Sequence, residues 1–251
     1  MTMFRPPKTE ETQRFYAGVA SGEKHKHHLW GKEARFNSRK VANSPSARLY
    51  FTARVASFLR PTDRVIDMGC GPGLFLPSLS PLCGQLVAAD VSEDFVRQSV
   101  ETIREFGLTN TKAVQASAEA LPFADGEFDV AIVSDTLHHL YNLKRSIDEV
   151  SRIVKRGGLI LIFEPNILNP ALFLMCLFDR NEWGVFGLCR KAAYAKIFKD
   201  RFRIERMEYN GLLIGPDSPL FMRIVNFLNH PRVSPLLGWL NPKIFIVVRN
   251  G

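Results

Sequence analysis

The sequence has no hydrophobic run long enough to cross a lipid bilayer. Its longest apolar stretches are residues 171–178 and 244–248, well short of the roughly 18 residues that a membrane-spanning helix needs. Its first residues carry charges of both signs and no apolar core, which is typical neither of a signal peptide nor of an acid-poor transit peptide. We therefore expect a cytoplasmic protein, and peripheral contact with a membrane is left open.

Motifs that hold metals are also missing. None of the cysteines lies in a C-x-x-C pair or at zinc-site spacing, so we expect buried, reduced thiols at Cys70, Cys83, Cys176 and Cys189. The histidines of residues 25–28 do not form an i, i+4 ligand pair, and no nearby carboxylate besides Glu23 completes a set. We expect no metal, and a lid or substrate-facing strip at residues 25–28.

Positive charge is concentrated in one part of the chain. Residues 1–60 contain 12 Lys or Arg against 4 Asp or Glu, whereas the remainder contains 21 of each, so the net charge of +8 comes from this leader. Such a leader attracts anionic lipid, nucleic acid or an acidic substrate, or it is only a solvated helical surface. Nucleic acid is the least favoured partner, because the sequence has no RNA-binding signature, no Asn-Pro-Pro-Tyr or Asp-Pro-Pro-Tyr, and no Pro-Cys nucleophile.

Short apolar segments alternate with amphipathic ones through most of the sequence. The pattern predicts strands at residues 64–67, 85–90, 111–115, 129–134, 159–164, 203–209 and 243–249, and helices at 9–22, 46–59, 75–82, 93–106, 143–154 and 191–198. This alternation predicts an α/β fold with a doubly wound, mostly parallel sheet that has helices on both faces. A ligand is expected at the carboxyl ends of the strands, with the first two helices as a lid.

A glycine-rich loop follows the first predicted strand. Gly69, Gly71 and Gly73 let the backbone turn tightly and approach a ligand, and their spacing differs from the G-x-G-x-x-G of dinucleotide-binding folds. Asp67 would repel a pyrophosphate but suits a cationic amino or sulfonium group. Asp90, at the end of the second predicted strand, suits the two hydroxyls of a ribose. The pattern indicates a nucleoside with a positively charged amino-acid tail.

With this loop and the segment Ala-Ser-Ala-Glu-Ala-Leu-Pro-Phe at 116–123, residues 50–165 resemble the class I S-adenosylmethionine-dependent methyltransferases. The resemblance implies a Rossmann-like sheet of seven strands whose last two pair antiparallel. It also implies S-adenosylmethionine as cofactor, with methionine at the glycine loop, ribose at Asp90 and adenine near Ser117. The implied cofactor residues are Asp67, Gly69, Cys70, Gly71, Gly73, Asp90, Val91, Ser117, Ala118, Glu119 and Ser134. Serine at 117 departs from the common Asp or Asn and offers an uncharged acceptor, which favours weaker cofactor binding.

Two histidines follow the fourth predicted strand, where the resembled enzymes often have Leu-His-His near the transferred methyl group. A hydroxyl or activated carbon acceptor needs a base, and we predict that His138 or His139 faces the cleft while the other fixes the loop. The alternative is that both only pack and hydrogen-bond. Glu164 and Asn166 either bind a polar group of the substrate or end the fifth strand and satisfy loop amides. Tyr16 is predicted to close over the amino-acid end of the cofactor.

Two apolar segments, at residues 166–187 and 211–242, lie after the cofactor-binding half. An insertion this apolar between paired strands has to be buried against the domain, a partner or a bilayer surface. We divide the chain into a helical leader, 1–60, and a methyltransferase domain, 61–251. The leading hypothesis is O- or C-methylation of a hydrophobic small molecule or lipid-linked acceptor at an anionic membrane surface. The alternatives are methylation of a soluble metabolite, with the insertion as a homo-oligomer interface, and a cofactor-binding scaffold without catalysis.

Overall fold

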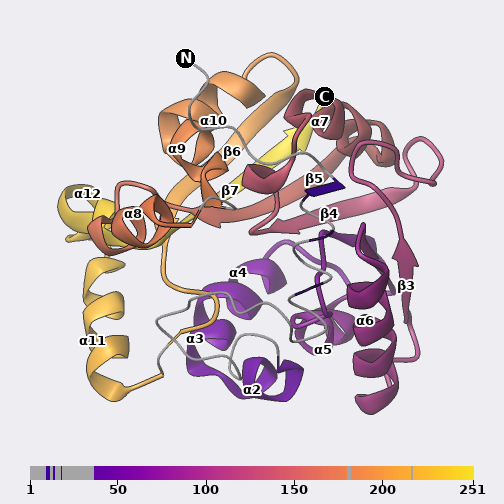
Figure 1. Cartoon of the computed structure of the whole chain (residues 1–251), viewed down its shortest axis with the longest axis horizontal. Coiled ribbons are helices and arrows are strands. Elements are labelled where there is room, and N and C mark those ends of the chain that lie inside the picture. The colour runs from indigo at the N-terminus through magenta and orange to yellow at the C-terminus, as the bar shows by residue number, and fades with distance from the viewer. Residues whose placement is uncertain (1–9, 12–13, 15–17, 19–36, 180–181, 216) are drawn as a thin grey trace.

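The described residues of the computed structural model, 10–11, 14, 18, 37–179, 182–215 and 217–251, are organised around a seven-stranded sheet (Figure 1). The strand order is β3-β2-β1-β4-β5-β7-β6. The first five strands pair in parallel, whereas β7 runs antiparallel to both of its neighbours. The strands are β1 (Arg64–Met68), β2 (Gln85–Asp90), β3 (Thr111–Gln115), β4 (Phe128–Ser134), β5 (Val154–Pro165), β6 (Phe202–Asn210) and β7 (Lys243–Asn250). The predicted α/β fold, with its parallel strands and antiparallel final pair, is confirmed.

Helices cover both faces of the sheet. Successive strand residues point to opposite faces, so that Val65 and Ile66 belong to two different core clusters. The face toward which Val65 points is covered by α4 (Ala53–Ala56), α5 (Leu76–Leu79) and α6 (Glu93–Glu105). The face toward which Ile66 points is covered by α7 (Leu143–Ile153), α9 (Gly184–Leu188) and α10 (Lys191–Phe198). Two layers of core therefore hold the strand ends at fixed positions.

Polar residues just before the helices set where several of them begin. The Ser92 hydroxyl accepts from the Phe95 amide at the start of α6, and the Asn142 side chain accepts from the Arg145 amide at the start of α7. The predicted helices 93–106, 143–154 and 191–198 agree with α6, α7 and α10 to within one residue at each end. The helix predicted at 75–82 is shorter and continues as the 3-10 turn η2 (Ser80–Leu82).

The second half of the predicted leader is built into the core. The helix predicted at 46–59 is present over residues 45–56 as an uninterrupted helical run of α3 (Pro45–Ala47), the π-helical turn η1 (Arg48–Thr52) and α4, and α2 (Ser38–Asn43) precedes it. Phe51 and Val55 are fully buried, and the Phe51 ring lies 3.9 Å from that of Phe75. Residues 45–56 therefore support the glycine loop from behind. The division of the chain at residue 60 stays a prediction, and most of the helix predicted at 9–22, with the histidines of 25–28, lies outside the described residues.

The two apolar segments form helices beyond the carboxyl ends of the strands. The first contains α8 (Pro170–Leu177) and α9, and the second contains α11 (Pro219–Leu228), α12 (Ser234–Leu237) and the 3-10 turn η5 (Gly238–Leu240). Figure 1 shows α8, α11 and α12 together at one side of the molecule, next to the end of β5. Within the described residues, no helix is long and apolar enough to span a membrane.

Candidate active site

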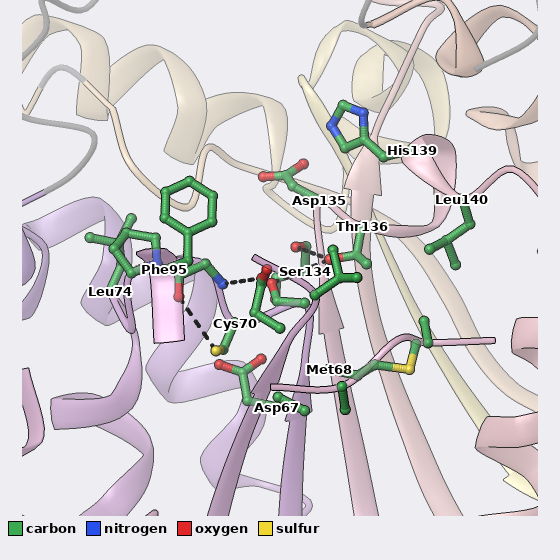
Figure 2. A pocket seen from close by; sticks show the side chains of 18 of the residues that line it. Asp67, Met68, Cys70, Leu74, Phe95, Ser134, Asp135, Thr136, His139 and Leu140 are labelled. Carbon is green, nitrogen blue, oxygen red and sulfur yellow. Dashed lines mark hydrogen bonds between the residues drawn. The ribbon is translucent and has the colours of Figure 1, made fainter. Parts of the chain in front are cut away.

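A pocket opens where β1, β2 and β4 end (Figure 2). Ten of the eleven predicted cofactor residues line it: Asp67, Gly69, Cys70, Gly71, Asp90, Val91, Ser117, Ala118, Glu119 and Ser134. Gly73 lies behind the loop with a φ of 78°, and a Cβ there would come within 2.8 Å of the Leu76 side chain. The structure therefore gathers residues from three separate sequence motifs at one end of the sheet. Tyr16 lies outside the described residues.

The glycine loop depends on backbone conformations that glycine adopts most readily. Gly69 has a φ of 76°, and its amide donates to the carbonyl of Ala89 at the end of β2. A Cβ on Gly69 would lie 2.3 Å from the hydroxyl of Thr136. Gly71 has a φ of 55°, and its amide donates to the Asp90 carboxylate at 2.8 Å. The loop is thus held between the ends of β2 and β4, with its backbone against the pocket.

The pocket carries negative charge that its own residues do not neutralise. Among the described residues that line it, none is Lys or Arg, while Asp67 and Asp90 are 2% and 9% exposed. Burial, and then the charge of Asp90, raise the pKa of Asp67 to about 7. Burial also raises the pKa of Asp90, against the opposing effect of hydrogen bonds from the amides of Ser92 and Gly71. A cationic ligand would stabilise both ionised carboxylates.

An unsatisfied hydroxyl also faces this space. The Ser134 oxygen is buried, lines the pocket and has no hydrogen-bond partner among the described residues. The Ser117 hydroxyl, at the other end, accepts from the Glu119 amide at 3.2 Å. The apolar wall includes Leu74 and Phe95. This mixture of acidic, hydroxyl and apolar groups fits a cationic amino-acid-bearing nucleoside.

The raised pKa of Asp67 predicts pH-dependent cofactor binding. Below about pH 7 the free protein holds Asp67 protonated, so binding a cation requires loss of a proton and the affinity for S-adenosylmethionine is expected to fall by about tenfold per pH unit. Above pH 7 the affinity is expected to level off. Calorimetric titration from pH 5.5 to about pH 8.5 measures this. Asp67→Asn should bind weakly with a flat profile, and an equally steep profile in this variant would assign the titration to another group.

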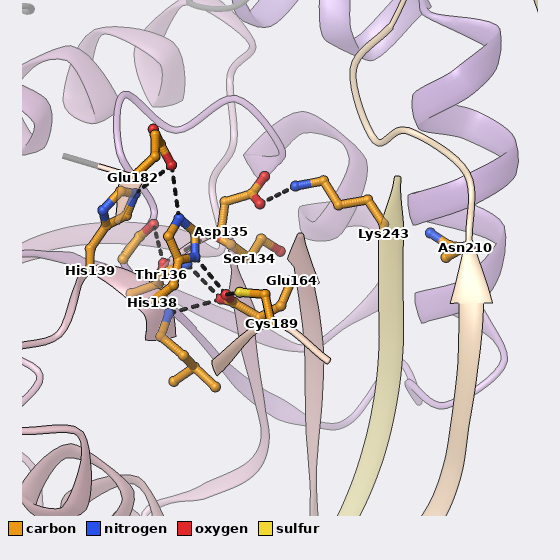
Figure 3. Close-up of polar contacts among 12 residues, drawn as sticks. Ser134, Asp135, Thr136, His138, His139, Glu164, Glu182, Cys189, Asn210 and Lys243 are labelled. Carbon is orange, nitrogen blue, oxygen red and sulfur yellow. Dashed lines mark hydrogen bonds and ion pairs between the residues drawn. The ribbon is translucent and has the colours of Figure 1, made fainter. Parts of the chain in front are cut away.

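The two predicted histidines occupy different environments (Figure 3). His139 lines the pocket, with its side chain 12% exposed. His138 is 2% exposed and lies behind it, with the two ring centroids 3.9 Å apart. Its Nδ1 is 2.6 Å from Glu164 Oε2 and its Nε2 is 3.2 Å from Glu182 Oε2. The structure thus brings one histidine to the pocket and places the other between two carboxylates.

The surroundings of His138 favour its protonated form. Burial by itself would lower its pKa, but the charge and hydrogen bond of Glu164, followed by those of Glu182, outweigh burial and raise the pKa to about 9. The ligand atoms of His138, His139 and Glu182 lie within 4.8 Å of one another, as do those of His138, Glu164 and Cys189. Because each nitrogen of His138 faces a carboxylate oxygen, this arrangement is that of an imidazolium whose two N–H groups donate.

Glu164 organises the loop that carries both histidines. It is fully buried at the end of β5, and its Oε1 accepts from the amides of Thr136 and Leu137, both at 2.8 Å. Asn166 is fully buried as well and donates to the carbonyls of Trp239 and Asn241. The sequence left two roles open for Glu164 and Asn166. This geometry favours the role in which they end the strand and form hydrogen bonds with loop backbone groups over the role in which they bind a substrate.

Three further features of the site could not be predicted from the sequence pattern. Asp135 lines the pocket with a φ of 52°, unusual for a residue other than glycine, and pairs with the buried Lys243 of β7. Ile214, from the apolar insertion, lines the pocket too. Helix α9 packs so closely on the histidine loop that a Cβ on Gly184 would lie 1.7 Å from the His138 carbonyl oxygen. Each feature depends on a contact between segments distant in sequence.

The cysteines are not built for nucleophilic chemistry. All four are buried, and none forms a disulfide. Burial, and then the charges of Asp90 and Asp67, raise the pKa of Cys70 well above its usual value, so its thiol stays protonated in the glycine loop.

Comparisons with known sequences point to one family. A family model described as a methyltransferase domain matches residues 66–162. A ubiquinone/menaquinone biosynthesis C-methyltransferase from Pasteurella multocida is 33% identical over 177 residues, which cover 65% of this chain and 66% of that protein. A protein of the same name from Yersinia enterocolitica is 35% identical over 120 residues, covering 45% and 48%. The chain thus matches just under two thirds of the first of these relatives and about half of the second.

Solved structures share the fold at lower identity. A SAM-dependent methyltransferase from Aquifex aeolicus superposes with a TM-score of 0.60 at 18% identity, covering 86% of this chain and all of that one. The [4+2]-cyclase SpnF superposes with a TM-score of 0.65 at 20% identity, covering 98% of both chains. Since a protein named as a cyclase has this fold, the architecture by itself does not define the reaction.

Proposed function

Because this chain belongs to the class I S-adenosylmethionine-dependent methyltransferases, we propose that it transfers a methyl group from S-adenosylmethionine to an apolar acceptor, on oxygen or carbon, at a membrane surface. The observation that carries the proposal is the pocket itself. Its lining combines two buried carboxylates that no Lys or Arg of the lining neutralises, an unsatisfied hydroxyl and His139.

The residues present fit the proposed cofactor. Asp67 would accept from the ammonium group, Asp90 from the ribose hydroxyls and Ser117 from the adenine amino group, with the glycine loop against the methionine part. When bound, the sulfonium supplies an electrophilic methyl group for an in-line displacement. The protein's own contribution is then to align the acceptor, exclude water and take up a proton where the acceptor has one to lose.

His139 is the better candidate for a general base. It lines the pocket, whereas His138 is buried and already protonated between Glu164 and Glu182. A base has to be neutral before it can accept a proton, which His138 is not at neutral pH. His138 fits the role of a positioning residue, which holds the loop that carries His139 in place.

An apolar acceptor is supported by the wall beside His139 and by the relatives. Leu140 and Ile214 line the pocket together with His139. The curated relatives are named for C-methylation in ubiquinone and menaquinone biosynthesis, which supports a quinone precursor or a similar hydrophobic ring as the acceptor class. The matching test incubates the protein with methyl-labelled S-adenosylmethionine and a lipid extract from a deletion strain. Label that stays in the aqueous phase would contradict an apolar acceptor.

Substitution of the two histidines is expected to separate their roles. His139→Asn should lower kcat by about 100-fold with little change in cofactor affinity, since general-base catalysis typically contributes 10²–10⁴-fold. Measured with S-adenosylmethionine at saturating concentration, so that the Asp67-dependent loss of cofactor binding does not contribute, it should also remove the acidic limb of the pH–rate profile. His138→Asn should instead lower thermal stability and leave the shape of that profile intact. A profile altered by His138→Asn and unchanged by His139→Asn would reverse the assignment.

A further inference from the structure

The helices beyond the strand ends expose large apolar side chains to solvent. The most exposed are Phe178, Leu236 and Leu220, at 86%, 74% and 69%. We call the whole set the apolar face: Leu168, Phe173, Leu174, Leu177, Phe178, Leu220, Ile224, Phe227, Leu236, Leu237 and Trp239. Scattered apolar residues are normal on a soluble protein, but a contiguous group marks an interaction surface.

Side-chain amides hold the segments of this face together. Asn166 and Asn169, which both precede α8, donate to the carbonyls of Trp239 and Leu240 in η5. Asn229, at the end of α11, donates to the Asn241 side chain at 2.9 Å. The three helices therefore form one unit at the side of the molecule where β5 ends, as Figure 1 shows. The face is preformed by these bonds.

Helix α11 has the pattern of a helix that lies on a surface. Leu220, Ile224 and Phe227 recur at spacings of four and three residues and are 50–69% exposed, whereas Val225 is buried against the domain. A helix that had to be buried only within its own domain would turn this stripe inward. The stripe points outward because the opposite side of α11 is occupied by contacts with the leader, including a hydrogen bond from Tyr50 to Asn226.

The charge of these segments favours one kind of partner. Residues 166–178 and 218–242 carry only Arg223 and Arg232 as charged side chains, both exposed, and the acids that adjoin them are Asp179 and Asp217, the second of which accepts from Ser44 and Ser46. Apolar and aromatic side chains with arginine at their border, on a chain of net charge +8, complement a bilayer of anionic lipid. A tryptophan, Trp239, is 40% exposed within the set, and tryptophan is enriched at membrane interfaces.

We propose that the apolar face docks on anionic lipid membranes and brings the pocket to an acceptor dissolved in the bilayer. Ile214, which lines the pocket, precedes α11 by five residues, so the segment that would contact lipid continues into the pocket wall. The purpose of docking rests on the proposed methyl transfer to an apolar acceptor. Docking itself requires only the face and its arginines.

Vesicle co-sedimentation without cofactor tests this proposal. The protein should sediment with vesicles that contain phosphatidylglycerol, less with pure phosphatidylcholine, and less at high salt. Phe227→Asp should lower the bound fraction about tenfold, since it places a charge in the apolar surface. Tyr141→Asp is the matched control, because Tyr141 is a similarly exposed aromatic outside α8, α11 and α12. It should bind vesicles as the parent protein does.

The outcomes separate docking from methyl transfer. Unchanged melting and unchanged affinity for S-adenosylmethionine in Phe227→Asp would show that its fold and cofactor site are intact. Absence of binding to anionic vesicles at low salt, or equal loss in both variants, would overturn the proposal. So would a dimer in light scattering that Phe227→Asp converts to a monomer while vesicle binding is absent. Vesicle binding by a protein that does not bind S-adenosylmethionine would overturn only the proposed function.

Discussion

Glu164→Gln is expected to lower the free energy of unfolding by about 3–5 kcal/mol, the typical cost of removing one partner from a buried ion pair. The side chain is fully buried and contacts His138 at 2.6 Å. Glutamine can still accept from the amides of Thr136 and Leu137, but its amide group would face the N–H of an imidazolium. His138 would retain Glu182 as its charged partner.

The pH dependence of this effect has a definite sign. The folded pKa of His138, about 9, lies above its usual value of 6.5, so the stabilisation is fully present below about pH 6.5 and is lost as the pH rises through 9. The difference in stability between the parent protein and Glu164→Gln should therefore be largest near pH 6 and shrink toward pH 10. Urea unfolding at several pH values measures it.

Glu182→Gln provides the matched control. Glu182 contacts the other nitrogen of His138 at 3.2 Å, but its side chain is 12% exposed and the contact is longer. The same chemical change should cost clearly less stability there, because solvent screens a partly exposed carboxylate. If both variants lost the same free energy of unfolding, burial of Glu164 would not be the reason for the large effect expected of Glu164→Gln.

Asp90→Ala is expected to lower the affinity for S-adenosylmethionine by at least about 100-fold, since charge-assisted hydrogen bonds contribute roughly 1.5–3 kcal/mol each. Two bonds to ribose would be lost. The carboxylate also accepts from the amides of Gly71 and Ser92, so the glycine loop and the start of α6 lose an anchor. Calorimetric titration measures the affinity.

A surface substitution controls for the change in charge. Asp94→Ala removes the same charge from the first turn of α6, where the carboxylate pairs with Arg97 at the surface. Its affinity should match that of the parent protein. Normal affinity in Asp90→Ala would exclude the ribose contact and, with it, the proposed orientation of the cofactor.

Those features of the protein that depend on residues close together in the chain could be predicted from the sequence. Alternating apolar segments located the strands, and the predicted segments 85–90 and 111–115 coincide with β2 and β3. The glycine spacing, with Asp67 and Asp90, located the pocket, because strands that run parallel end at the same edge of the sheet. Local periodicity and turn chemistry carry this information without reference to distant residues.

The roles of individual side chains at the pocket were decided by tertiary contacts. His138 and His139 are adjacent and identical in sequence, yet one meets Glu164 and Glu182, which lie 26 and 44 residues away, and the other lines the pocket. The sequence could not distinguish them, because Glu182 lies near both rings and the difference arises from Glu164, which the fold places beside His138, and from the deeper burial of His138. In the same way, composition showed that residues 211–242 are apolar, but only packing against the leader turned Leu220, Ile224 and Phe227 outward. The sequence by itself determined the fold and the kind of cofactor, whereas the folded chain decided burial, and burial set charge and exposure.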